Sequence, residues 1–175
     1  MLLALLIATS LDPTIGPPPP AELMQLRTQL TAQLNAHRRD AGLTPLGVDP
    51  IAQRAAEFQA VDMMNVGKMN HIDTAGRSPI ARYEAFGGKA DYYGENLGFR
   101  SPGVVDPLLL WEVLSKLDAK MMAEVPPDDG HRQNILSSHY SAVGIGIAVG
   151  PDGVFMCEDF SSIKEPSTGT SSSSP

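Results

Sequence analysis

Hydrophobic residues recur at helical spacing near the start of the chain. Four leucines lie three or four residues apart: Leu23, Leu26, Leu30 and Leu34. This spacing predicts an amphipathic helix that opens at Pro20 and ends at Gly42, because glycine is the usual residue just beyond a helix end.

Three further helix starts are marked by a capping side chain followed by proline. They are Asp49-Pro50, Ser78-Pro79 and Asp106-Pro107. Proline is favoured at the first helical position, where its missing N–H costs nothing. The apolar runs after them predict helices over 51–66, 80–86 and 108 to about 124. A last short helix is expected over 131–137, with Asp128 or Asp129 able to cap it.

The remaining apolar segments predict three strands, over 92–99, 142–149 and 154–160. The last two flank Gly150-Pro151-Asp152-Gly153, a turn sequence, and are expected to form a hairpin. Both hairpin strands carry apolar residues on both faces, so helices should cover both sides of the sheet. The predicted fold is therefore α+β: a three-layer α-β-α sandwich around a small, mainly antiparallel sheet.

The two ends of the chain differ from the middle. Residues 1–16 predict a secretory signal peptide, which would make the protein extracellular, and 17–20 form a polyproline linker. The apolar start is too short to span a bilayer, which needs about 20 apolar residues, so no transmembrane anchor is expected. The folded domain is expected over 21–164, followed by a disordered Ser-rich tail over 165–175.

Charge and cysteine content exclude some classes of protein. The net charge of -7 argues against nucleic-acid binding, which needs clustered basic residues. The one dense basic pair, Arg38-Arg39, is interpreted as a solvated helix end. The single cysteine, Cys157, excludes an intramolecular disulfide and is expected to be a small buried apolar residue, with a reactive thiol as the alternative.

The four histidines occupy different contexts. His37 lies in the last turn of a predicted helix, where the dipole favours a cation, and is interpreted as structural. His139 is expected at the surface. His71 follows a helix end, while His131 opens a helix, where unpaired N–H groups disfavour its charged form. Glu95 lies in mid-strand and must find partners or be protonated.

Several stretches, in this order, resemble the CAP superfamily: LNAHRRDAGLTPLGVDPIAQRAAEF, MNHIDTAGRSP, YYGENLGF, MMAEVPPDDGHRQNIL, YSAVGIGIAV and EDF. This superfamily, also called the SCP domain, includes cysteine-rich secretory proteins and plant pathogenesis-related proteins. The chain is most similar to its disulfide-free bacterial branch. GEN followed by GHRQNIL and then VGIGIA carries most of the resemblance.

The resemblance implies a central cleft that holds two histidines and two acids. The matching positions are His71, Glu95 and His131, with the second acid placed on Glu124. The family's Trp-x-x-Glu pattern fails here, because the residue three positions after the tryptophan is Leu114. Glu112 is the alternative for the second acid, and loss of that acid is a third outcome.

Such a cleft has several chemical interpretations. Neutral imidazoles suit Zn²⁺ or another divalent metal, with His71 and His131 as metal ligands. Without metal, acid–imidazole hydrogen bonds would hold the cluster together and raise the histidine pKa values. The resemblance favours a secreted binding domain for a small-molecule, lipid or peptide ligand. The alternatives are a metal-dependent hydrolase of peptides or cell-wall fragments, with Glu95 as general base, and an extracellular scaffold whose cluster is purely structural.

Overall fold

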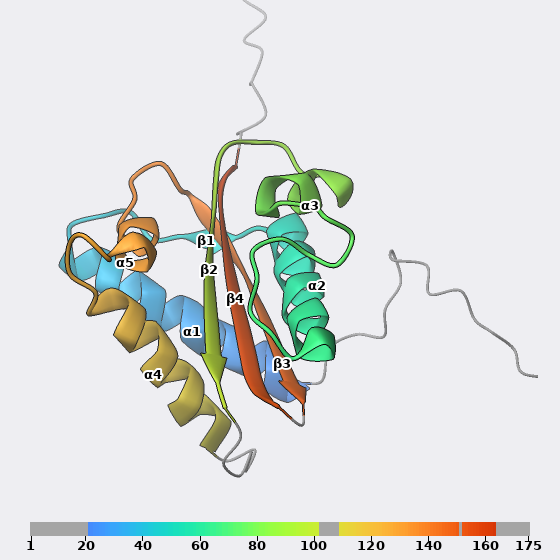
Figure 1. Cartoon of the computed structure of the whole chain (residues 1–175). Helices are drawn as coiled ribbons and strands as arrows, with labels where there is room; N and C mark the ends of the chain where they lie inside the picture. Colours follow the sequence, from blue (N-terminus) through green and yellow to red (C-terminus); the bar gives the residue numbers. More distant parts are fainter. Residues whose placement is uncertain (1–20, 102–108, 151, 164–175) are drawn as a thin grey trace, which may run out of the picture.

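The computed structural model describes residues 21–101, 109–150 and 152–163. Its elements, in chain order, are α1 (Ala21–Asp40), β1 (Gly47–Val48), α2 (Pro50–Val66), α3 (Pro79–Ala85), β2 (Ala90–Arg100), α4 (Leu110–Met122), α5 (Gly130–Ile135), β3 (Ala142–Gly150) and β4 (Gly153–Ile163). The helices α1, α4 and α5 lie on one side of the sheet and α2 and α3 on the other (Figure 1). The predicted three-layer α-β-α sandwich is confirmed.

The sheet has the strand order β1-β3-β4-β2. The hairpin strands β3 and β4 pair antiparallel, and β2 pairs antiparallel with the other side of β4. Only the two-residue β1 runs parallel, beside β3, so the sheet is mainly antiparallel as predicted. β1 was not predicted, because two residues are too few to show a period.

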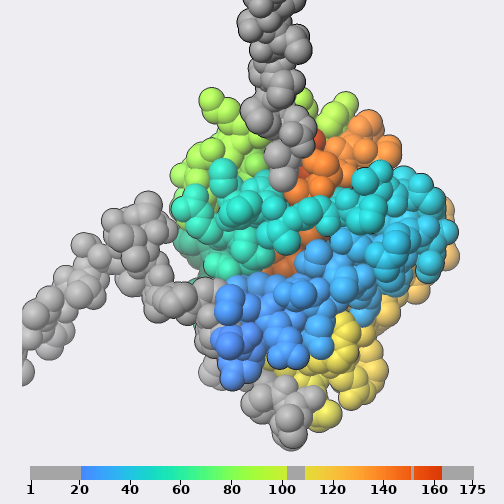
Figure 2. Space-filling view, turned by 180° about the vertical axis from the view of Figure 1, so that it is seen from behind, coloured from blue at the N-terminus to red at the C-terminus, as the bar shows by residue number. Residues whose placement is uncertain are grey.

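The face of the sheet under α2 is closely packed. A Cβ added at Gly146 of β3 would overlap the backbone carbonyl of Ala56, and one at Gly144 would overlap the backbone of Ala52 and Gln53. Glycine on the strand and alanine on the helix therefore let the two backbones approach each other. Seen from behind, α2 lies beside α1 (Figure 2), to which it is joined by the ion pair between Arg27 and Glu57 at 2.8 Å.

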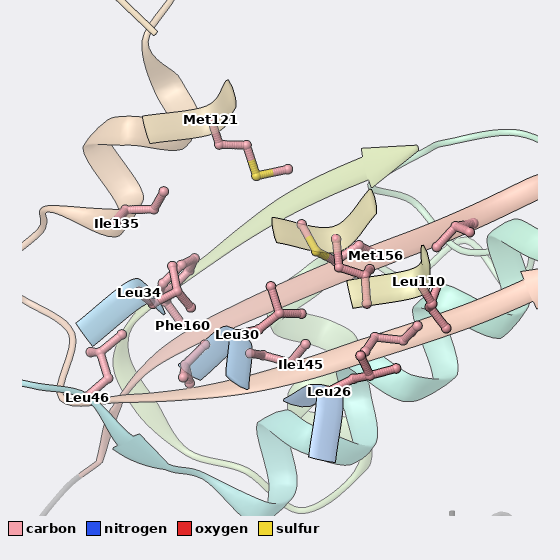
Figure 3. Close-up of a cluster of buried hydrophobic side chains, with 14 residues drawn as sticks. Leu26, Leu30, Leu34, Leu46, Leu110, Met121, Ile135, Ile145, Met156 and Phe160 are labelled. Atoms are coloured by element: carbon pink, nitrogen blue, oxygen red, sulfur yellow. The ribbon is translucent and has the colours of Figure 1, made fainter. Parts of the chain in front are cut away.

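The opposite face buries the larger hydrophobic core (Figure 3). Leu30 and Leu34 of α1 pack there against Ile145 of β3 and Phe160 of β4, and all four are buried. Full burial of one such side chain stabilises the fold by about 1.5–3 kcal/mol. The leucine spacing that predicted α1 is therefore the spacing that seats it on the sheet.

Two predicted helix caps are confirmed. The Oδ1 atom of Asp49 accepts hydrogen bonds from the first amides of α2, and Ser78 Oγ accepts one from Ala81 at the start of α3. The start predicted at 106–107 lies outside the described residues, as do the signal peptide over 1–16, the linker over 17–20 and the tail over 165–175.

The interpretation of Arg38 as solvated was wrong. Its side chain is fully buried beneath α5, whereas Arg39 is exposed. The guanidinium donates to four backbone carbonyls, those of Thr44, Ile135, Ser137 and Tyr140, at 2.8–3.2 Å. Arg38 turns inward because these carbonyls, two of them at the end of α5, supply the acceptors that water would otherwise provide.

Candidate functional site

His71 forms the first acid–imidazole pair. It lies in the loop between α2 and α3, with Nδ1 2.7 Å from Oε1 of Glu95 on β2. The Glu95 side chain is 1% exposed, and its other oxygen accepts a hydrogen bond from the fully buried Arg82 of α3. The mid-strand acid thus finds the partners that burial of a carboxylate requires. The His71 side chain is 54% exposed, so the ring faces solvent.

His131 forms the second pair, with Glu124, just beyond the end of α4. Its Nδ1 lies 2.5 Å from Glu124 Oε1, and Glu124 Oε2 accepts the backbone amide of His131 at 3.0 Å. Asp129 occupies the N-cap position of α5 but makes no capping hydrogen bond. Glu124 therefore supplies the acceptor at this helix start. Glu112, the alternative acid, pairs with Lys116 on the exposed side of α4.

Two asparagines connect these pairs. Asn134 of α5 donates to the backbone oxygen of Glu95 at 3.3 Å and to the side chain of Asn96 at 2.9 Å. Asn96 donates in turn to the backbone oxygen of His131 at 3.2 Å. Among the described residues, no hydrogen bond or ion pair joins the two imidazole–acid pairs directly. The start of α5 is nevertheless held against the strand segment that carries Glu95.

The electrostatics follow from these contacts. The hydrogen bond to Glu95 raises the pKa of His71 and outweighs both burial and the charge of Arg82. Burial acts to raise the pKa of Glu124, but its hydrogen bonds with the His131 ring and with backbone amides lower that pKa overall. These contacts therefore favour the protonated form of His71 and the ionised form of Glu124.

A buried group lies beneath Glu95. The Cys157 sulfur is 3.4 Å from Glu95 Oε2, and ligand atoms of Glu95, Cys157 and Asp159 lie within 4.8 Å of one another. Burial, and after it nearby negative charge, raises the pKa of both Cys157 and Asp159 well above the ordinary values. Arg82 already binds Glu95, and burial favours the protonated forms of Cys157 and Asp159 beneath it. The predicted burial of Cys157 is confirmed, although its neighbours are polar on one side.

Arg82, Asn96 and Asn134 were not predicted from the sequence. The two asparagines stand in the GEN and HRQN motifs, but nothing in their spacing shows that they bond to each other. A buried acid signals that a cation is needed, yet it does not say which one. The other two histidines lie outside these pairs: His37 contacts Asp118 at 3.0 Å, and the exposed His139 stacks on Tyr92 with ring centroids 4.2 Å apart.

One curated protein is similar to the chain in sequence. It is described as "Uncharacterized protein YkwD" of Bacillus subtilis (strain 168), and it is 26% identical over 129 residues. The match covers 73% of this chain and 44% of the relative, so the chain spans less than half of that protein.

Solved structures share the fold at low identity. An outer surface protein from Borrelia burgdorferi superposes with a TM-score of 0.65 and 14% identity, over 80% of this chain and 94% of that one. An extracellular protein containing an SCP domain from Bacillus anthracis superposes with a TM-score of 0.59 and 20% identity, over 85% of this chain and 45% of that one. The model of the "CAP: Cysteine-rich secretory protein family" matches residues 31–160, which is most of the chain. The chain therefore belongs to the CAP family of cysteine-rich secretory proteins, as the sequence resemblance implied.

Proposed function

We propose that this chain is a secreted binding domain whose cleft holds a divalent metal ion with His71 and His131. The observation that carries the proposal is shared by both rings. In each, Nδ1 contacts a carboxylate, which leaves Nε2 as the nitrogen available to a metal. Imidazoles that ligate metals commonly have this carboxylate behind them, because it fixes the tautomer and raises the basicity of the ligating nitrogen.

The donor set fits Zn²⁺ or a similar ion. Both rings are accessible, with the His71 side chain 54% exposed and that of His131 35% exposed. Glu95 and Glu124 act as supporting partners, since each already spends its oxygens on hydrogen bonds. A ligating imidazole must be neutral, so the raised pKa of His71 makes a proton compete with the metal at acidic pH.

The surroundings indicate an amphipathic ligand. Two imidazoles leave positions on an ion that oxygen donors, such as a carboxylate or phosphate, fill. Met69 and Ile72 flank His71 in the sequence and are 43% and 45% exposed. We expect the anionic group of a lipid or peptide to bind the ion while its apolar part lies on these side chains.

Secretion is part of the proposal. Its supports are the apolar start of the chain and the description of the solved relatives as extracellular or outer-surface proteins. Within the described residues, none of the helices combines the length and the apolar character needed to cross a bilayer. Immunoblotting of culture medium and cell fractions tests this part.

Zinc titration calorimetry of the purified protein tests the metal site. We expect one-to-one binding for the wild type and its loss in both His71→Ala and His131→Ala. His139→Ala is the matched control, because it removes an exposed histidine that belongs to neither pair. Glu95→Gln should bind about 10–100-fold more weakly.

The outcomes separate the candidate functions. Wild-type zinc affinity in either His71→Ala or His131→Ala would refute the site. If the wild type binds no zinc and both histidine variants have a much lower melting temperature, the His/Glu cluster has a structural role. Chelator-sensitive cleavage of peptides or cell-wall fragments would favour the hydrolase.

A further inference from the structure

A polar hollow of about 400 Å³ lies beside α5 and the loop that joins it to β3. None of the residues of the two imidazole–acid pairs is among the described residues that line it. Most of the residues that do line it are polar: Asp129, Arg132, Gln133, Ser137, Ser138 and His139. The hollow is therefore separate from the proposed metal site.

The lining offers both donors and acceptors of hydrogen bonds. Arg132 is half-buried there, and among the described residues its guanidinium has no hydrogen bond or ion pair. Asp129 is 6% exposed and accepts a hydrogen bond from Gln133 Nε2 at 2.7 Å. The formal charges of the arginine and the aspartate cancel. Such a lining suits a ligand whose groups both donate and accept hydrogen bonds, as hydroxyls do.

His139 adds a flat aromatic surface to the hollow. Its exposed ring is stacked on Tyr92, with the centroids 4.2 Å apart and an angle of 17° between the planes. Tyr92 covers one face of the imidazole and is not among the described residues of the lining, so the remaining surface of His139 borders the hollow. The stack fixes the orientation of the imidazole. The electron-rich face of an aromatic ring attracts weakly positive hydrogens, such as those on the C–H groups of a sugar ring.

The loop that carries these side chains lies at the surface but is held from beneath. The buried Arg38 donates to the backbone carbonyls of Ser137 and Tyr140 at 2.8 and 3.2 Å. Ser137 Oγ accepts a hydrogen bond from the backbone amide of His139 at 3.2 Å. The loop is therefore in place before a ligand arrives, which reduces the entropy cost of binding.

We propose that this hollow binds a saccharide, with the C–H face of one sugar ring packed on His139 and its hydroxyl groups bound by the polar side chains of the lining. The guanidinium of Arg132, the carboxylate of Asp129 and the carboxamide of Gln133 are planar groups that each reach two neighbouring hydroxyls. A bare anion at Arg132 would share the hollow with the Asp129 carboxylate, and a metal ion would share it with the guanidinium. A neutral, hydroxyl-rich ligand avoids both conflicts.

Saturation-transfer NMR with soluble tetrasaccharides of glucose, mannose and N-acetylglucosamine tests the site. We expect at least one of them to bind. Arg132→Met should weaken that binding at least about tenfold, because methionine keeps the apolar stem but loses the donors, and His139→Ala should weaken it about three- to tenfold. Arg39→Met is the matched control, because it removes an exposed arginine that does not line the hollow. Circular dichroism checks that each variant keeps the wild-type fold.

A chemical-shift titration locates the ligand without any variant. The saccharide should shift the ring resonances of His139 and leave those of His71 and His131 unchanged. No saturation transfer to any of the tetrasaccharides would overturn the proposal, and so would wild-type affinity in Arg132→Met and His139→Ala. Shifts at His71 or His131 in place of His139 would overturn it too, because the sugar would then lie in the cleft. Binding of inorganic phosphate that Arg132→Met abolishes, with no response to a saccharide, would overturn it in favour of an anion site.

Discussion

Replacing Arg38 with methionine tests how far one buried cation organises the fold. Methionine keeps most of the apolar stem of the arginine, so the change removes the guanidinium with little loss of packing. Arg39→Met is the matched control, since the neighbouring arginine is exposed.

The magnitude follows from the four hydrogen bonds to the carbonyls of Thr44, Ile135, Ser137 and Tyr140. A hydrogen bond to a charged group contributes about 1.5–3 kcal/mol, and a buried acceptor left without a donor costs about 1–3 kcal/mol. These effects overlap at one side chain, and desolvation of the cation already offsets part of the gain. We expect Arg38→Met to lower the free energy of unfolding by about 3–5 kcal/mol. Arg39→Met should change it by less than about 0.5 kcal/mol.

Equilibrium urea unfolding, followed by both fluorescence and circular dichroism, measures the two changes. Arg38→Lys should fall between the wild type and Arg38→Met, because an ammonium keeps the charge but lacks the planar fork that reaches several carbonyls. If Arg38→Met and Arg39→Met agree within about 1 kcal/mol, the buried guanidinium does not organise α5 as argued.

Two further predictions concern the cleft and the sheet. In Glu95→Gln, measured in EDTA, the pKa of His71 in an NMR titration should fall toward its ordinary value. The variant should lose more stability at pH 5.5 than at pH 8, because a raised histidine pKa stabilises the fold at low pH. An unchanged His71 pKa would contradict the pairing with Glu95. In Gly146→Ala the new methyl group would meet the backbone of α2, so the free energy of unfolding should fall by about 3 kcal/mol. Gly130 has open space around it, so Gly130→Ala should lower that free energy by less than about 0.5 kcal/mol. Equal losses for the two variants in urea unfolding would show that the backbones of α2 and β3 are not in close contact.

The elements that could be predicted from the sequence are those with local signals. Asp49-Pro50 and Ser78-Pro79 each place an acceptor beside the first free amides of a helix, so the chemistry is complete within four residues. The hairpin was likewise visible in its turn and in two apolar runs. β1 was not predicted, because its pairing depends on β3, which lies far away in the chain.

The buried charges could not be predicted, because their partners are distant in sequence. Arg38 looks like any basic residue near a helix end, because three of its four acceptors lie about a hundred positions later in the chain. Glu158 looks like one polar residue among apolar ones, yet its side chain is fully buried and its partner Asn96 lies 62 positions earlier in the chain. For the cleft, local spacing identified His71, His131 and Glu95 as unusual, and family resemblance suggested that they belong together; that they form one metal site stays a prediction.

The single cysteine of the chain is also a built-in probe of how often the sheet opens. Cys157 sits on the central strand with no surface open to solvent. A thiol reagent can reach this sulfur only in molecules whose strands have separated. The rate of thiol labelling under native conditions therefore measures how often the sheet opens, and no engineered probe is needed.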